Sequence, residues 1–375
     1  MTTMTESATR FEPDWVSPPG ETIADLLEER GWSQQELAQR LGYSEKHVSQ
    51  LINGKVPLTD DAAMRLNSVL GGPVGFWLKR EAQYRERLAQ QEAKTRFAGW
   101  QDWLDQIPVR ELMKHGCIAK NRIDAHSKPA IVEQCLSFFG VASPDGWRAR
   151  YGTLQHQFRR SREEQCNLGA IAAWLRLGEQ VAEKQSGPRY DEAKFRQALD
   201  EMRGLTVLAP EQFAPRLNAL FRDSGVIFVL VPALPKSHVS GVARWLEADR
   251  PLIQLPLYGK TNDRFWFTLF HEAAHILLHG KNRKSKESVF LDDPVRQTST
   301  SAQEREANDW ARDWLIPSAC KRDLVQLKTK LAVLAFAHQL SIHPGIVVGR
   351  LQHDEVIPPS WMNDLKDSFR ITEST

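Results

Sequence analysis

Apolar residues in the first quarter of the chain recur at helical spacing, and they predict five short helices. The stripes lie at 22–29, 33–41, 44–52, 59–70 and 75–94. Ser33, Ser44 and Thr59 stand where helix-capping residues are expected, and glycines end the second, third and fourth helices. The pattern predicts a compact helical bundle over residues 20–95.

The remaining pattern is mostly helical, with one β-rich stretch. Helical spacing recurs at 108–119, 128–140, 167–184 and 191–203, and again at 262–279, 302–316, 320–330, 331–340 and 343–352. Apolar runs at 225–234, 239–246 and 251–257 read as strands of a small antiparallel sheet. We therefore predict an α+β, mainly helical protein. Its parts would be a bundle at 20–95, a helical connector at 96–204 and a third domain at 205–360.

Composition narrows the class of protein. The 375 residues are 41% hydrophobic and 26% charged, as in soluble globular proteins, and the net charge is only +2. Any affinity for nucleic acid must therefore come from a local surface. Four scattered cysteines without a CxxC pair argue against a disulfide framework and against a cysteine-ligated zinc site. With no signal peptide and no apolar stretch of about 20 residues, we expect a cytoplasmic protein that does not contact a membrane.

The strongest chemical signal is His271-Glu272-Ala273-Ala274-His275. Histidines at positions i and i+4 stand one turn apart on one helix face, so both imidazoles can reach one metal ion. The flanking residues are apolar nearly all round the helix, which is typical of a buried helix. Since buried polar groups need partners, a metal ion accounts for them. The motif predicts zinc (Zn2+) bound by His271 and His275, with Glu272 as catalytic base.

Catalytic zinc sites take three protein ligands and keep one position open. The predicted helix at 302–316 presents Glu304 and Asn308 on one face with Ala307 and Ala311, which permit close packing against the motif helix. We expect Glu304 to be the third ligand and Asn308 to hydrogen-bond a ligand histidine. The alternative is a charged helix start that faces solvent.

The chemistry expected of such a site is peptide hydrolysis, with Glu272 taking a proton from the attacking water and delivering it to the leaving amine. His279, one turn beyond His275, either stabilises the oxyanion or has a structural role at the helix end. The strand at 252–257 is the expected edge for an extended peptide substrate.

The second and third predicted helices, joined by a glycine turn, have the spacing of a major-groove reader. Lys46, His47 and Gln50 lie where they can reach base edges, Ser44 starts the third helix, and Gln34 lies where a helix N-terminus meets phosphate. We predict that these five residues contact a double-stranded operator, with a homodimer reading two half-sites. An ordinary helical bundle with a polar face is the alternative.

Two separate stretches resemble known families. A resemblance to the HigA-type branch of the Xre helix-turn-helix proteins is carried by WSQQELAQRLGYSEKHVSQLINGK and FWLKREAQY. A resemblance to the ImmA/IrrE metallopeptidases, a gluzincin-like family, is carried by VSGVARWL, RFWFTLFHEAAHILLHGK, VFLDD and EREANDWARDWLIP. Together they span roughly 20–95 and 205–320. Ala274 departs from a frequent glycine, and Trp310 and Trp314 replace smaller apolar residues.

The second resemblance implies zinc held by His271, His275 and Glu304, with Glu272 catalytic. Some members of that family cleave helix-turn-helix repressors. The expected function is therefore a DNA-binding regulatory zinc metalloendopeptidase whose target is a repressor or a toxin-system partner. The alternative is an antitoxin-like transcription regulator whose zinc domain senses or binds a partner.

Overall fold

The computed structural model describes residues 17–158, 167–256, 261–280, 290–291 and 302–369. The chain divides into two compact units. The first spans Met1–Gln101 and Ile123–Ala130, and the second spans Asp102–Arg122 and Ile131–Thr375. The predicted domain boundaries at 95/96 and 204/205 stay predictions.

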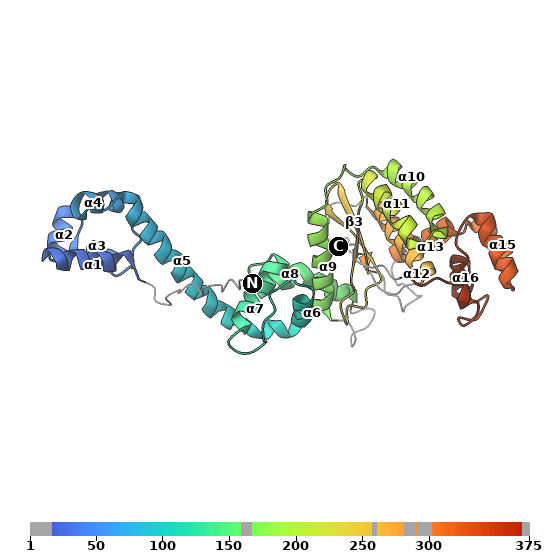
Figure 1. Ribbon diagram of the computed structural model, residues 1–375, viewed down its shortest axis with the longest axis horizontal. Coiled ribbons are helices and arrows are strands. Elements are labelled where there is room, and N and C mark those ends of the chain that lie inside the picture. The colour runs from blue at the N-terminus through green and yellow to red at the C-terminus, as the bar shows by residue number, and fades with distance from the viewer. Residues whose placement is uncertain (1–16, 159–166, 257–260, 281–289, 292–301, 370–375) are drawn as a thin grey trace, which may run out of the picture. The chain divides into compact units, whose positions relative to one another are not determined.

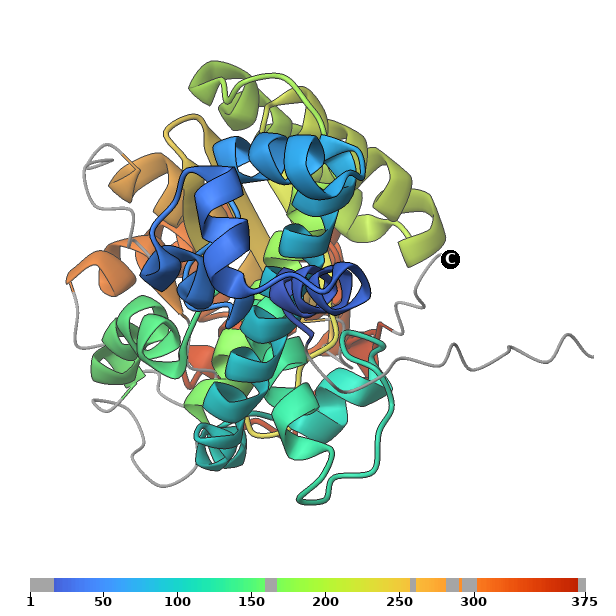
Figure 2. The same ribbon diagram turned by 90° about the vertical axis from the view of Figure 1, so that its left-hand side faces the viewer.

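The first unit is a helical bundle, as predicted. Its helices are α1 (Pro19–Arg30), α2 (Gln34–Leu41), α3 (Glu45–Ile52), α4 (Asp60–Leu70) and α5 (Val74–Ala98). Figure 2 shows α1 to α4 (blue) gathered around the start of α5. The core is apolar and includes fully buried Ile23, Leu37 and Val48 and the indole of Trp77, whose Nε1 donates to the Gly71 carbonyl at 3.0 Å.

Local capping explains why these helices start and stop where they do. The hydroxyls of Ser33, Ser44 and Thr59 accept backbone N–H groups three residues on, at 3.1–3.3 Å. Gly42 ends α2 at φ 69°, a left-handed conformation that favours glycine. The turn between α2 and α3 is therefore fixed by residues 42 to 44.

The second unit contains the rest of the helices and one sheet (Figure 1). These helices are α6 (Val109–Lys114), α7 (Lys128–Phe139), α8 (Pro144–Phe158), α9 (Leu168–Glu183), α10 (Glu192–Gly204), α11 (Pro210–Asp223), α12 (Asn262–Ala274), α13 (Ala302–Leu315), α14 (Lys321–Leu324), α15 (Lys330–Leu340) and α16 (Pro344–His353). The start of α7, up to Ala130, falls in the segment assigned to the first unit. A π-helical turn, η3 (His275–His279), extends α12. Short 3₁₀ turns lie at Gln101–Gln106, Leu205–Val207, Ser318–Cys320 and Asn363–Leu365.

The sheet is small, as predicted, but mixed rather than purely antiparallel. Its strands are β1 (Ile227–Val231), β2 (Val242–Glu247), β3 (Arg250–Pro256) and β4 (Phe290–Leu291), in the order β1-β3-β2-β4. β1 pairs with β3 in parallel, whereas β2 is antiparallel to β3 and to β4. β2 and β3 are joined by a short turn, which forces them to be antiparallel, but β1 reaches β3 only across β2 in sequence and is free to run parallel.

The prediction that residues 252–257 form an edge strand open to a peptide substrate is wrong. Within the described residues this strand is β3, which lies between β1 and β2 and has both edges paired. Every residue from Pro251 to Pro256 is buried, as in a central strand covered on both faces. A peptide cannot add to this strand without displacing a neighbour.

Helices cover both faces of the sheet. On one face, α9 is hydrogen-bonded to all three longer strands. The Trp174 Nε1 donates to the Val231 carbonyl at 3.3 Å, Gln254 Nε2 to the Trp174 carbonyl at 2.7 Å, and Arg244 Nη2 to the Leu175 carbonyl at 2.7 Å. The intervening residues Ala243, Ile253 and Leu255 point the other way. They share a core with α12 side chains such as Trp266, Leu269 and Phe270.

Two helices of the second unit are missing from the predicted pattern. The Pro144-Asp145-Gly146 sequence, expected to form a turn, is the first turn of α8, with the Ser143 hydroxyl accepting the Gly146 N–H at 3.1 Å. Proline is well suited to that first position. α11 contains Pro215, and a proline within the segment argues against a helix when only the sequence is considered.

The α15–α16 pair repeats the local geometry of α2–α3. Ser341 ends α15 at φ 52°, as Gly42 ends α2, and the next residue donates its N–H to the carbonyl five positions back in both turns. The exposure differs, however, because Gly345 and Ile346 at the start of α16 are buried. A β-carbon on Gly345 would lie 2.4 Å from Asn262 Oδ1 of α12, so this face holds α12.

A segment late in the chain also secures the start of α12. Thr261 and Ser368 form an isolated antiparallel bridge, and the Asn262 N–H donates to the Asp367 carbonyl at 2.8 Å. Asp263 pairs with Lys366 at 2.6 Å in a nearly buried position. Residues 366–368 are referred to below as the strap.

Among the described helices, none has on its own the length and apolar composition of a membrane span. α15 and α16 reach these limits only as a pair, and that pair is bent by 115°.

Candidate metal centre

The residues of the His-Glu motif lie in the interior, as the apolar flanks of their helix predict. α12 is buried along nearly its whole length, and His271, Glu272 and His275 are at most 1% exposed. The Nε2 atoms of His271 and His275 face each other at 3.1 Å. Two buried imidazoles therefore point at one place.

α13 brings Glu304 to the same place. Its Oε2 lies 3.3 Å from His271 Nε2, and its Oε1 lies 3.4 Å from His275 Nε2. One ligand atom from each residue lies within 4.8 Å of the others, so the three side chains form a group that could hold a metal ion. Ala307 and Ala311 are fully buried, and their small side chains let α13 approach α12 closely.

The protonation states suit metal binding. Burial lowers the pKa of His275 to about 4, against the opposing effect of Glu304, so the imidazole is neutral near pH 7. Burial alone would raise the pKa of Glu304, but hydrogen bonds with His271 and His275 outweigh it and lower that pKa to about 2. A neutral imidazole and an ionised carboxylate are the forms that bind metal.

Glu272 lies against the start of β2. A β-carbon built on Gly241 would lie 2.5 Å from Glu272 Oε1, and 2.9 Å from both Leu255 Cδ2 and Thr268 Cγ2. Only glycine leaves room there for the carboxylate. Sequence reasoning missed Gly241, because nothing local marks a contact made across 31 positions.

His279 contacts His275, one of the three candidate metal ligands. Its Nδ1 lies 3.0 Å from His275 Nδ1, and its Nε2 lies 3.1 Å from Glu306 Oε2. The π-helical turn places the two rings 5.1 Å apart between centroids. The structure thus puts His279 behind His275, and it puts Glu306 of α13 behind His279.

Asn308 is half-buried on α13. Among the described residues, the neighbour of His275 Nδ1 is His279. The role predicted for Asn308 beside a ligand histidine stays a prediction.

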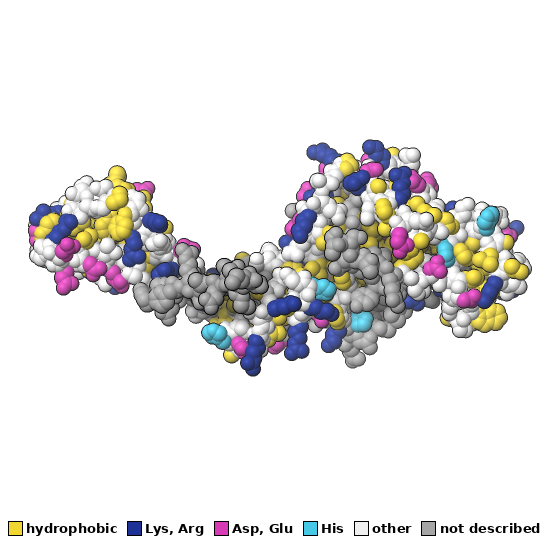
Figure 3. Space-filling view, in the orientation of Figure 1, with side chains coloured by type: hydrophobic (Ala, Val, Ile, Leu, Met, Phe, Trp, Pro, Cys, Tyr) yellow, Lys and Arg dark blue, Asp and Glu magenta, His cyan; other side chains and the backbone are white. Residues whose placement is uncertain are grey.

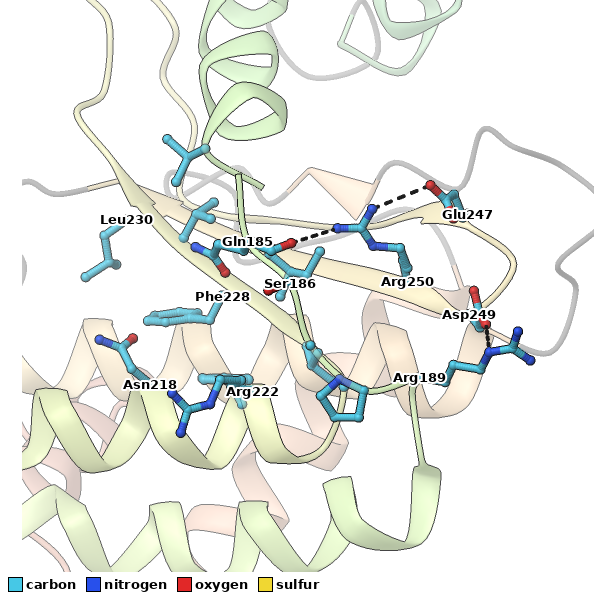
Figure 4. Close-up of a pocket in the computed structure, with 18 residues that line it drawn as sticks. Gln185, Ser186, Arg189, Asn218, Arg222, Phe228, Leu230, Glu247, Asp249 and Arg250 are labelled. Carbon is cyan, nitrogen blue, oxygen red and sulfur yellow. Dashed lines mark hydrogen bonds and ion pairs between the residues drawn. The ribbon is translucent and has the colours of Figure 1, made fainter. Parts of the chain in front are cut away.

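The hollow drawn in Figure 4 is not at this centre. It has a volume of about 800 Å³ and runs along edge strand β1 between α11 and residues 185–189. Its charged side chains are paired, Arg189 with Asp249 at 3.2 Å and Arg250 with Glu247 at 3.5 Å. None of the metal-binding candidates lines it, so the hollow is separate from the candidate metal centre.

The five predicted DNA-contacting residues lie on α2 and α3 or at their ends. Gln34, Ser44 and Lys46 are exposed, whereas His47 and Gln50 are half-buried. His47 packs edge-on against Tyr43 at 4.7 Å between centroids, and the Ser44 hydroxyl caps α3. The visible face of this unit carries both basic and acidic side chains (Figure 3), which agrees with the low net charge. Their contacts with DNA stay predictions.

Two stretches of the chain match models of known protein families. Residues 23–77, which hold α2, α3 and α4, match the helix-turn-helix family. Residues 227–350, which hold the longer strands, α12 and α13, match the family described as the IrrE N-terminal-like domain, a peptidase family. Among curated proteins, no match to the chain was found. The chain therefore joins a helix-turn-helix domain to an IrrE N-terminal-like peptidase domain.

Proposed function

We propose that this protein is a DNA-binding regulatory zinc metalloendopeptidase. The observation that carries the proposal is the convergence of His271, His275 and Glu304 within 4.8 Å, beside a fully buried Glu272. The match of residues 227–350 to a peptidase family supports the same interpretation.

The donor set fits zinc better than the hard cations. Two imidazole nitrogens and one carboxylate are typical ligands of catalytic zinc, whereas calcium and magnesium prefer oxygen donors throughout. Three protein ligands leave a coordination position for water or substrate. Glu272 follows His271 directly in the chain and is not one of the three grouped ligands.

When bound, zinc lowers the pKa of a water molecule to about 7 and polarises the substrate carbonyl. Glu272 takes the proton of the attacking water and passes it to the leaving amine. Gly241 leaves room for that carboxylate, since a β-carbon at position 241 would lie 2.5 Å from Glu272 Oε1. Burial excludes bulk water from the carboxylate and the two imidazoles, which strengthens the electrostatic interactions among them.

In this proposal the helix-turn-helix domain binds an operator and so brings the peptidase domain to DNA. We propose a homodimer that reads two operator half-sites about one helical turn apart through Gln34, Ser44, Lys46, His47 and Gln50. The protein target is a repressor or a toxin-system partner, and the site of action is the cytoplasm. A HigA-type origin of the DNA-binding domain is part of the same proposal.

The test is Glu272→Gln in the full chain. Gln has nearly the same shape but cannot take a proton, so hydrolysis should fall by about 10²–10⁴-fold while zinc content and operator binding stay unchanged. Asp309→Asn, an equivalent change at an exposed position of α13, is the control and should leave all three unchanged. If Glu272→Gln behaves as wild type in every cellular assay while Lys46→Ala fails, the protein is instead a regulator with a partner-binding zinc domain.

A further inference from the structure

Glu306, His279 and His275 lie in a row that leads from the protein surface to the candidate metal centre. The three side chains form a chain of close contacts, at 3.1 Å between Glu306 Oε2 and His279 Nε2 and at 3.0 Å between the two Nδ1 atoms. The His279 side chain is 5% exposed and Glu306 is 61% exposed, so the chain of contacts runs from the surface to a buried ligand.

A carboxylate oxygen accepts hydrogen bonds, so the His279 nitrogen that faces Glu306 must carry a proton. In a neutral imidazole the other nitrogen is then an acceptor. His279 Nδ1 is therefore an acceptor that faces His275 Nδ1. Glu304 Oε1 faces the other nitrogen of His275, Nε2, at 3.4 Å and draws the proton there in the absence of a metal ion. A metal ion on Nε2 would require the proton to stand on Nδ1, where His279 accepts it.

We propose that Glu306 and His279 are positioning residues that stabilise the tautomer of His275 whose Nε2 can bind the metal. The inference rests on the proposed metal site and extends it to two residues that lie outside the ligand set. Partners behind a ligand histidine typically change metal affinity by about 10–100-fold.

The π-helical turn makes this arrangement available. α12 gives way to this wider turn at His275, and the turn ends at His279. Gly280 follows, and a β-carbon there would lie 2.5 Å from the Ile276 carbonyl oxygen and 2.7 Å from the Trp245 ring. Turns of this kind are frequent at functional sites. Here the turn and its glycine hold His279 directly behind His275.

The experiment reverses the direction of the hydrogen bonds along the contacts from Glu306 through His279 to His275, which we call the relay. Lysine at position 306 can only donate, so Glu306→Lys would make His279 Nε2 an acceptor and its Nδ1 a donor, which could no longer accept a proton from His275 Nδ1. Glu306→Gln keeps an accepting oxygen. Zinc affinity, measured in the full chain by competition with a chelating dye, should fall by about 10–100-fold in Glu306→Lys and stay near wild type in Glu306→Gln.

Asp309→Lys is the matched control. Asp309 is exposed, lies on α13 and lines the same surface hollow as Glu306, so the variant makes the same change in charge without touching His279. Asp309→Lys should retain wild-type zinc affinity. Equal losses in the two lysine variants would reduce the effect to charge and overturn the relay.

A second readout needs no metal. Nitrogen chemical shifts of His279 in the metal-free protein report which of its ring nitrogens carries the proton. A proton on Nε2, the nitrogen that faces Glu306, in the wild type and on Nδ1 in Glu306→Lys supports the relay, and a wild-type proton on Nδ1 overturns it. If the wild type holds no zinc, the proposed peptidase function fails, while this measurement still decides the relay.

Discussion

Gly241 and Glu272 lie so close that a β-carbon at position 241 would be 2.5 Å from Glu272 Oε1. The glycine precedes β2 and the glutamate lies on α12, so the contact joins the sheet to the motif helix. Leu255 and Thr268 enclose the same point. A side chain at position 241 would therefore have to displace this carboxylate or its neighbours.

Gly241→Ala should displace this carboxylate while leaving the three candidate metal ligands intact. A displacement of about 1 Å can reduce turnover by up to about 100-fold. We expect that loss in a peptide hydrolysis assay, with zinc content unchanged by elemental analysis. Gly204→Ala is the control, because a β-carbon there meets nothing within 4 Å. Wild-type turnover in Gly241→Ala would show that the contact does not position Glu272.

The recognition helix gives a prediction for DNA binding. Lys46→Ala combined with Gln50→Ala should weaken binding to the operator more than binding to random duplex, because contacts to base edges carry the specificity. Lys94→Ala, at an exposed site near the end of α5, is the control. Binding to the two DNAs is compared at one salt concentration. Equal losses on both would mean that these side chains contact only the phosphate backbone.

Glu179 should matter more for stability than any single arginine around it. It lies on α9 and accepts from Arg244 at 2.7 Å, Arg176 at 2.9 Å and Arg150 at 3.1 Å. Glu179→Gln leaves the buried Arg244 without a counter-charge and should cost about 3–5 kcal/mol in the free energy of unfolding. Arg244→Met leaves Glu179 with two partners and should cost less.

Chemical denaturation of the full chain, followed by tryptophan fluorescence, compares these two variants. Glu201→Gln is the control, because Glu201 pairs with Arg216 at 2.6 Å at the exposed surface, where such pairs contribute about 1 kcal/mol or less. A larger loss in Arg244→Met than in Glu179→Gln would contradict the proposed order.

Glu179 also makes stability depend on pH. Burial alone would raise its pKa, but the arginines outweigh burial and hold the pKa below its ordinary value of 4.5. The stabilisation is therefore complete above pH 4.5 and is lost as the pH falls through the lower native pKa. The free energy of unfolding, measured from neutral pH to about pH 3, should fall less steeply in Glu179→Gln than in wild type. Parallel curves would exclude Glu179 as a source of acid sensitivity.

The sequence was sufficient where structure depends on neighbours in the chain. The helices of the first unit begin at Ser33, Ser44 and Thr59 because each hydroxyl caps the N–H three residues on. The i,i+4 spacing of His271 and His275 similarly determines that their Nε2 atoms meet. Glu304 was found because it shares a helix face with small residues.

The rest depends on partners distant in the chain. The parallel pairing of β1 with β3 and the contact of Gly241 with Glu272 follow from how elements pack, which no local pattern encodes. One signal was present, since the nearly continuous apolar run of β3 is typical of a central strand rather than an edge. The proline at the start of α8 was equally compatible with a turn.

Because of the strap, the two units are completed at different times during synthesis. Residues 366–368 fasten Thr261, Asn262 and Asp263, yet the ribosome makes them after every other element of the second unit. The helix-turn-helix bundle ends at Ala98 and needs none of them. Domains generally fold as they emerge, N-terminal first. A nascent chain therefore presents a finished DNA-binding bundle while its motif helix still lacks the fastening at its N-terminal end.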